Sequence, residues 1–115
     1  MAESTPGSVH IPWYATGFRG EKLEAALAEL AAVAPRYGAT YFAVYRSRDD
    51  RYKFLQVVDF ASKLEWERYW TGPEFTAFRT TCSSWFQVPI AYIWNDIVAV
   101  GGRTPSEAAL QPVTE

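Results

Sequence analysis

Apolar and polar positions alternate along this chain in a way that separates six regular segments. Four of them are rich in aromatic and β-branched residues, which predicts β-strands over residues 8–18, 39–47, 52–60 and 88–100. The other two have the three- and four-residue apolar spacing of amphipathic helices, over residues 20–38 and 62–81. The polar stretch 48–51 predicts a hairpin turn between the second and third strands.

Local signals mark the ends of both helices. Pro35 ends or kinks the first helix, and Gly38 is placed to leave it in the left-handed conformation. Ser62 and Glu65 have the S-x-x-E spacing of a capping box, in which each side chain satisfies a free backbone N–H group. The second helix is therefore predicted to begin at Ser62.

A second capping signature lies inside the second helical segment. Residues 71–74 repeat the S/T-x-x-E spacing, with Thr71 as the cap and Pro73 where the first turn of a helix tolerates it. The segment 62–81 therefore predicts two short helices, or one helix broken at Gly72.

The order of the elements, βαββαβ, predicts an α+β, ferredoxin-like fold with a four-stranded antiparallel sheet. One domain over residues 8–102 accommodates all of them. Residues 1–7 and 103–115 combine Pro with small polar residues and have no sustained apolar period, so we expect flexible tails there.

The predicted strands are apolar on both faces. In strand 39–47, Tyr41 and Tyr45 alternate with Phe42 and Val44. Two helices cover only one face of such a sheet, and a bare second face would exceed the apolar patch that monomers usually expose. We therefore expect a homodimer, packed sheet to sheet with two-fold symmetry, and a dimeric α+β barrel.

Composition narrows the class of protein. The chain has 115 residues, enough for one domain, and 17% of them are aromatic, so some rings must lie near a pocket or an interface. The net charge of -2 argues against binding to nucleic acid, which requires a basic patch. No apolar run is long enough to span a membrane, and the first ten residues do not read as a signal peptide, so we expect a cytoplasmic protein with no membrane partner.

The run from Tyr45 to Phe78 resembles the antibiotic-biosynthesis monooxygenase family, within the wider group of dimeric α+β barrels. The resemblance rests on an Asp-rich hairpin turn, an aromatic strand, a Ser-capped helix and a Thr-x-x-x-Phe break: Asp49, Asp50, Phe54, Ser62, 71–75 and Phe78. It covers about a third of the chain by motif and is more specific for fold than for activity.

The resemblance implies a choice of chemistry. Haem-degrading relatives ligate iron through a His late in the second helix, whereas the corresponding position here is near Arg79 and that helix contains no His. Other relatives are cofactor-independent monooxygenases that form quinones from a phenol held between sheet and helices. We therefore expect no cofactor and no metal.

His10 is the only histidine and is the candidate general base, with a partly solvated residue at a strand end as the alternative. By the two-residue period of a strand it shares a face with Tyr14, which would contact a phenolic substrate or pack in the dimer interface. Asn95 stands in an otherwise apolar strand, where an amide must find partners, so it is the second candidate catalytic residue.

Helical spacing places Trp66, Tyr69 and Trp70 on one face. They either stack on an aromatic or polyketide-like ligand or form an unusually large core. Two functions remain open on this basis. One is a monooxygenase-like enzyme that uses these residues with His10 and Asn95, and the other is a non-catalytic dimeric module that binds a ligand or another protein.

Overall fold

Four antiparallel strands form one sheet in the order β2-β3-β1-β4, which confirms the ferredoxin-like fold class. The structure is a computed structural model that describes residues 5–102. The strands are β1 (Gly7–Tyr14), β2 (Ala39–Arg46), β3 (Lys53–Phe60) and β4 (Ile93–Asp96). The predicted tail 103–115 and residues 1–4 of the predicted N-terminal tail lie outside the described residues.

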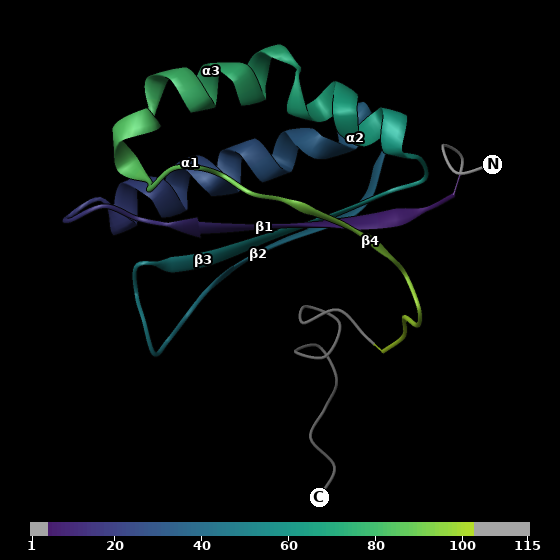
Figure 1. Ribbon diagram of the computed structural model, residues 1–115, viewed down its shortest axis with the longest axis horizontal. Helices are drawn as coiled ribbons and strands as arrows, with labels where there is room; N and C mark the ends of the chain where they lie inside the picture. Colours follow the sequence, from purple (N-terminus) through teal and green to yellow (C-terminus); the bar gives the residue numbers. More distant parts are fainter. Residues whose placement is uncertain (1–4, 103–115) are drawn as a thin grey trace, which may run out of the picture.

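The helices lie together on one face of the sheet, as Figure 1 shows. They are α1 (Gly20–Val33), α2 (Lys63–Trp70) and α3 (Pro73–Thr81), with short 3₁₀ turns η2 (Ala34–Tyr37) and η3 (Ser83–Trp85). No described helix covers the opposite face, which we call the open face. Alternate strand residues point to the helices and form the core, among them Val9, Ile11, Trp13, Phe54, Val58 and Phe60.

The helix boundaries follow the local signals closely. Gly38 ends η2 with φ 99°, the left-handed conformation predicted for it. Ser62 caps α2, since its Oγ accepts a hydrogen bond from the backbone N–H of Glu65 at 3.4 Å. The segment 62–81 consists of two helices, as predicted.

Three boundary predictions were wrong. Gly72, and not Thr71, is the N-cap of α3, because the Thr71 hydroxyl donates back to the Glu67 carbonyl at 2.7 Å. The strand predicted over 8–18 ends at Tyr14. The strand predicted over 88–100 is reduced to β4, which pairs only with Gly7–His10 of β1. Pro12 and Pro89 lack an N–H group, so a longer ladder between the two segments would lose hydrogen bonds.

A chain of buried hydrogen bonds ties the sheet to the helices. Trp13 Nε1 donates to Gln56 Oε1 at 3.1 Å, and Gln56 Nε2 donates to the Tyr69 hydroxyl at 3.2 Å. That hydroxyl donates in turn to the Leu30 carbonyl of α1 at 2.6 Å. The network thus crosses β1, β3, α2 and α1 and supplies partners for the buried polar groups of Trp13, Gln56 and Tyr69, whereas the buried Trp66 Nε1 has no hydrogen-bond partner among residues 5–102.

Candidate functional site

The open face carries a cleft of about 390 Å³ at the end of the sheet where β4 pairs with β1. Its polar residues are brought together by strand register. Ser8 of β1 lies opposite Asp59 of β3 on one side and opposite Asn95 of β4 on the other, and His10 follows two residues later on the same face. The cleft is lined by all four.

Side-chain hydrogen bonds fix one member of this polar group. Asn95 Nδ2 donates to the Ser8 carbonyl at 3.0 Å and to the Ile93 carbonyl at 3.2 Å, which holds the amide against the strands. Asp59 Oδ1 is buried and has no hydrogen-bond partner among residues 5–102. A buried acceptor without a donor is costly, so this oxygen marks a place where a ligand proton or a water is expected.

Apolar residues complete the cleft. Val57 lies beside His10 in the register, and the chain after β4 turns beneath the open face, so that residues 97–100 form the opposite wall. Figure 1 shows this turn at the yellow end of the described chain. The cleft therefore combines an apolar body with a few convergent polar groups, as small-molecule sites commonly do.

Tyr14 lies on the open face, as predicted, but at the other end of β1. Its hydroxyl donates to Asp50 Oδ2 at 2.7 Å, and its ring stacks on Tyr52 at 6.2 Å between centroids. This hydrogen bond raises the pKa of Tyr14 and lowers the pKa of the Asp50 carboxyl. Tyr14 is thus engaged with the β2-β3 hairpin and does not line the cleft.

Trp66, Tyr69 and Trp70 lie on the helical face, where each packs against other rings. Trp66 and Tyr69 are fully buried, and Phe75 contacts Tyr69 at 5.0 Å and Trp70 at 4.8 Å between centroids. Burial raises the pKa of the Tyr69 hydroxyl, which stays protonated. The sheet separates these three rings from His10 and Asn95, so one substrate on one chain cannot contact both sets.

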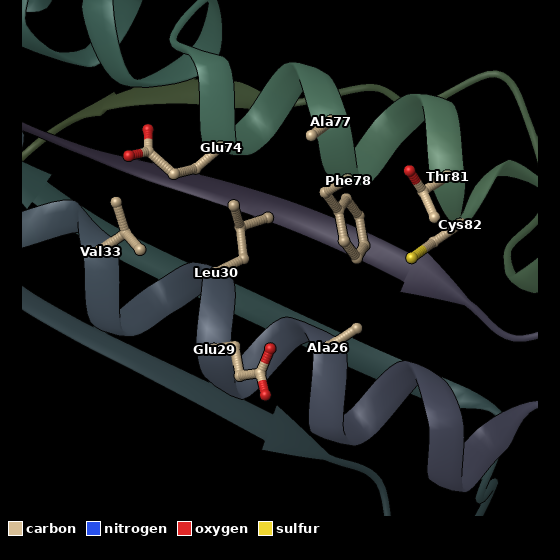
Figure 2. A pocket seen from close by; sticks show the side chains of 9 residues that line it. All are labelled: Ala26, Glu29, Leu30, Val33, Glu74, Ala77, Phe78, Thr81 and Cys82. Carbon is tan, nitrogen blue, oxygen red and sulfur yellow. The ribbon is translucent and has the colours of Figure 1, made fainter.

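A second hollow, a groove of about 310 Å³, lies between α1 and α3. Figure 2 shows Phe78 and Cys82 pointing from α3 and its C-terminal end towards α1, where Leu30 faces them. Glu29 and Glu74 contribute a carboxylate from each side. Sequence reasoning missed this groove and Ser8 of the cleft, and it favoured a helix-entry role for Asp59 over a functional one. The available signals were small residues on facing helices and a polar residue inside an apolar strand.

No group of His, Cys, Asp and Glu side chains in the described part of the chain is arranged to hold a metal ion. Within residues 5–102, none of the helices has the length and apolar character that crossing a membrane requires.

Comparison with known proteins identifies the fold. No protein-family model matches the chain, and no curated protein matches it in sequence. A solved structure from Pseudomonas aeruginosa superposes with a TM-score of 0.74 at 20% identity, covering 84% of this chain and 98% of its own. A proposed antibiotic biosynthesis monooxygenase from Nitrosomonas europaea superposes with a TM-score of 0.74 at 14% sequence identity, covering 86% of this chain and 97% of its own.

A second proposed antibiotic biosynthesis monooxygenase, from Bordetella bronchiseptica, gives a TM-score of 0.71 at 18% identity and covers 83% of this chain and 99% of its own. The resemblance stated from the sequence is therefore confirmed for the fold: this chain is folded like antibiotic biosynthesis monooxygenases. At these identities the likeness shows the fold alone.

Proposed function

We propose that this chain is a homodimeric, cofactor-independent monooxygenase-like enzyme that acts on a flat phenolic or polyketide-like molecule in the open-face cleft. One observation carries the proposal. His10 and Asn95, predicted as catalytic from opposite ends of the sequence, line the same cleft together with Ser8 and Asp59. The residue types and the period of each strand do not by themselves require His10 and Asn95 to lie close together.

The chemistry needs no bound cofactor, because the substrate supplies the electrons. His10 accepts the phenolic proton, and the resulting phenolate transfers one electron to dioxygen. The aryloxyl radical and superoxide then combine at a ring carbon, and the protonated His10 returns its proton to the resulting peroxide anion. Loss of the hydrogen on that carbon and of hydroxide from the peroxide, together one water, leaves a quinone. For an anthrone the balance is anthrone plus dioxygen giving anthraquinone plus water. Asn95 positions the substrate oxygen, and the Asp59 carboxylate accepts the proton of the oxygenated ring carbon and passes it to the departing hydroxide, which leaves as water.

A second copy of the chain is the proposed partner on the open face. The helices of the described residues, α1, α2 and α3, cover the other face, and open-face side chains such as Tyr41, Tyr45 and Ile93 remain 39%, 50% and 60% exposed. Burying such a surface against its own copy stabilises a two-fold dimer. Light scattering at micromolar concentration tests this, and a monomer would contradict it.

Oxygen uptake with anthrone-like phenols tests the enzyme. We expect turnover by the wild type and a loss of about 10²-fold or more in His10→Ala, because a general base contributes that order of acceleration. Asn95→Ala should also lose activity. Glu67→Gln, an exposed change on α2, is the matched control. Full activity in both cleft variants would overturn the assignment of the site.

A non-catalytic ligand-binding module is the second candidate, favoured by the burial of Trp66 and Tyr69. Because these rings pack in the core, their abundance is explained without a substrate. Native mass spectrometry distinguishes the two: a co-purified ligand that shows no turnover with dioxygen would support the module.

A further inference from the structure

The segment 97–100 has the sequence of a β-strand but pairs with no strand among residues 5–102. It reads Ile-Val-Ala-Val, and β-branched residues favour strands. Val98 and Val100 are 94% and 87% exposed. The ladder between β4 and β1 stops just before this segment, at the pair Gly7 and Asp96, and Pro6 has no N–H group to donate to a longer ladder. The segment therefore leaves its own sheet without a strand partner.

Strand β2 lacks a partner of its own on one side. It forms one edge of the sheet and pairs only with β3 among the described residues. Its regular part, residues 41–45, contains no proline and no charged residue, which are the features that usually prevent pairing at an edge. A hollow lined by residues 39–45 runs along it. An exposed apolar edge of this kind is a template for one more strand.

Segment 97–100 is too short to reach the β2 edge of its own sheet. β2 and β4 lie at opposite edges, so a strand added outside β2 lies four strand spacings from β4. At about 4.8 Å for each spacing, this separation is about 19 Å. Residue 100 lies at most about 14 Å from Asp96, because each residue of an extended chain spans at most about 3.6 Å. The β2 edge that this segment can pair with therefore belongs to another copy.

The direction of the chain leads the segment towards a second copy. Figure 1 shows that after β4 the chain turns beneath the open face, away from the helices. This is the face on which the proposed function places the second copy. Residues 97–100 also form one wall of the cleft that contains His10 and Asn95.

We propose that residues 97–100 of each copy add as a fifth strand to the β2 edge of the other copy, and that this pairing fixes the wall of the cleft. The proposal rests on the homodimer of the proposed function and names the segments that join the two copies. Two-fold symmetry makes the contact twice in each dimer. The cleft is then complete only in the dimer, because its wall is held by the partner.

Hydrogen exchange of backbone amides, measured by NMR on the full chain, tests the pairing. Adjacent N–H groups of a strand point to opposite sides, so only one of Val98→Pro and Ala99→Pro removes a hydrogen bond to β2. We expect that variant to speed exchange of the β2 amides that point away from β3, and to weaken dimerisation, each by about ten-fold or more. The other proline should change neither. Val98→Thr, which keeps the N–H group and the branched side chain, is the matched control.

A dimer that mixes isotope-labelled and unlabelled copies shows which chain supplies the added strand. We expect nuclear Overhauser effects between the methyl groups of Val98 or Val100 in one copy and β2 in the other. Contacts to β2 from within the same copy, whether from residues 97–100 or from residues 103–115, would overturn the proposal. So would two proline variants that both leave exchange and dimerisation unchanged.

The outcomes separate this inference from the proposed function. A dimer by light scattering whose outward β2 amides exchange as fast as unpaired ones would overturn the strand addition and leave the homodimer and the enzyme standing. A monomer would overturn both the homodimer and the strand addition. Strand addition without oxygen uptake would support the inference and contradict the enzyme.

Discussion

Replacing Tyr69 by Phe removes one hydroxyl from the middle of the buried network and leaves the ring in place. The hydroxyl donates to the Leu30 carbonyl at 2.6 Å and accepts from Gln56 Nε2 at 3.2 Å, and Tyr69 is fully buried. Phe fills the same volume, so no large cavity forms and the ring contacts remain. The change therefore isolates the hydrogen bonds from the packing.

The expected loss of stability is about 2 kcal/mol, within a range of about 1–3 kcal/mol for a buried polar group left without its partner. The change leaves two buried groups without a partner, because the Tyr69 hydroxyl bonds both the Leu30 carbonyl of α1 and the Gln56 amide of β3. For a domain of this size the midpoint of thermal unfolding should fall by about 8 °C, at about 4 °C per kcal/mol.

Urea unfolding followed by circular dichroism measures this loss, at one fixed protein concentration so that association does not change the result. Tyr92→Phe is the control, because this tyrosine is 36% exposed and lies on the helical side of the sheet, away from the open face, so its change should stay within about 0.5 kcal/mol. Gln56→Leu combined with Tyr69→Phe should cost less than the sum of the two single changes, since the two groups are direct partners. A loss below about 0.5 kcal/mol in Tyr69→Phe would refute the structural role given to this network.

Two further predictions concern the backbone and the pH dependence of stability. Gly38→Ala should cost about 1–2 kcal/mol in the same unfolding assay, because φ is 99° and an added Cβ would lie 2.5 Å from Glu65 Oε2. The control is Gly17→Ala, which should change stability by less than about 0.5 kcal/mol because no atom lies within 4 Å of the added Cβ. Equal losses of stability in the two variants would contradict the reasoning. Burial raises the pKa of Tyr69 above its ordinary value of 10.0, so the unfolded chain loses this proton first and the protein should lose stability as the pH rises above 10. In Tyr69→Phe, the loss of unfolding free energy with pH should become less steep by up to about 1.4 kcal/mol per pH unit. An unchanged dependence of stability on pH would contradict this prediction.

Sequence-based predictions were more accurate for features set by interactions between residues close in sequence than for features set by contacts between distant segments. Gly38 and Ser62 act within one helical turn, and both were placed correctly because capping and left-handed geometry are local. Thr71 was placed wrongly although its signal was also local. Its hydroxyl could accept a hydrogen bond from a backbone N–H group of the following helix or donate one to a carbonyl of the preceding helix, and it donates to the Glu67 carbonyl. The length of β4 depended on how many residues of β1 it could pair with. These two segments are far apart in sequence, so the local pattern of either segment does not give that number.

The same distinction separates the residues of the cleft. His10 and Asn95 were recognised because each departs from the apolar pattern of its own strand. Their meeting with Ser8 and Asp59 depends on register across three strands, which the period of a single strand does not specify. The groove between α1 and α3 depends on how two helices pack on the sheet, which the apolar period of either helix alone does not specify.

The aromatic face of α2 shows what helical spacing can and cannot predict about the role of a side chain. Helical spacing correctly predicts that Trp66 and Tyr69 point the same way, but a core and a pocket wall require the same spacing. The capacity of the hydroxyl to form hydrogen bonds separates the two alternatives. A tyrosine has one O–H donor, and in Tyr69 the Leu30 carbonyl already accepts it. A substrate could obtain that donor only by breaking the bond that anchors α1, so any ligand chemistry is better served by the open-face cleft, where Asp59 Oδ1 has no partner among the described residues.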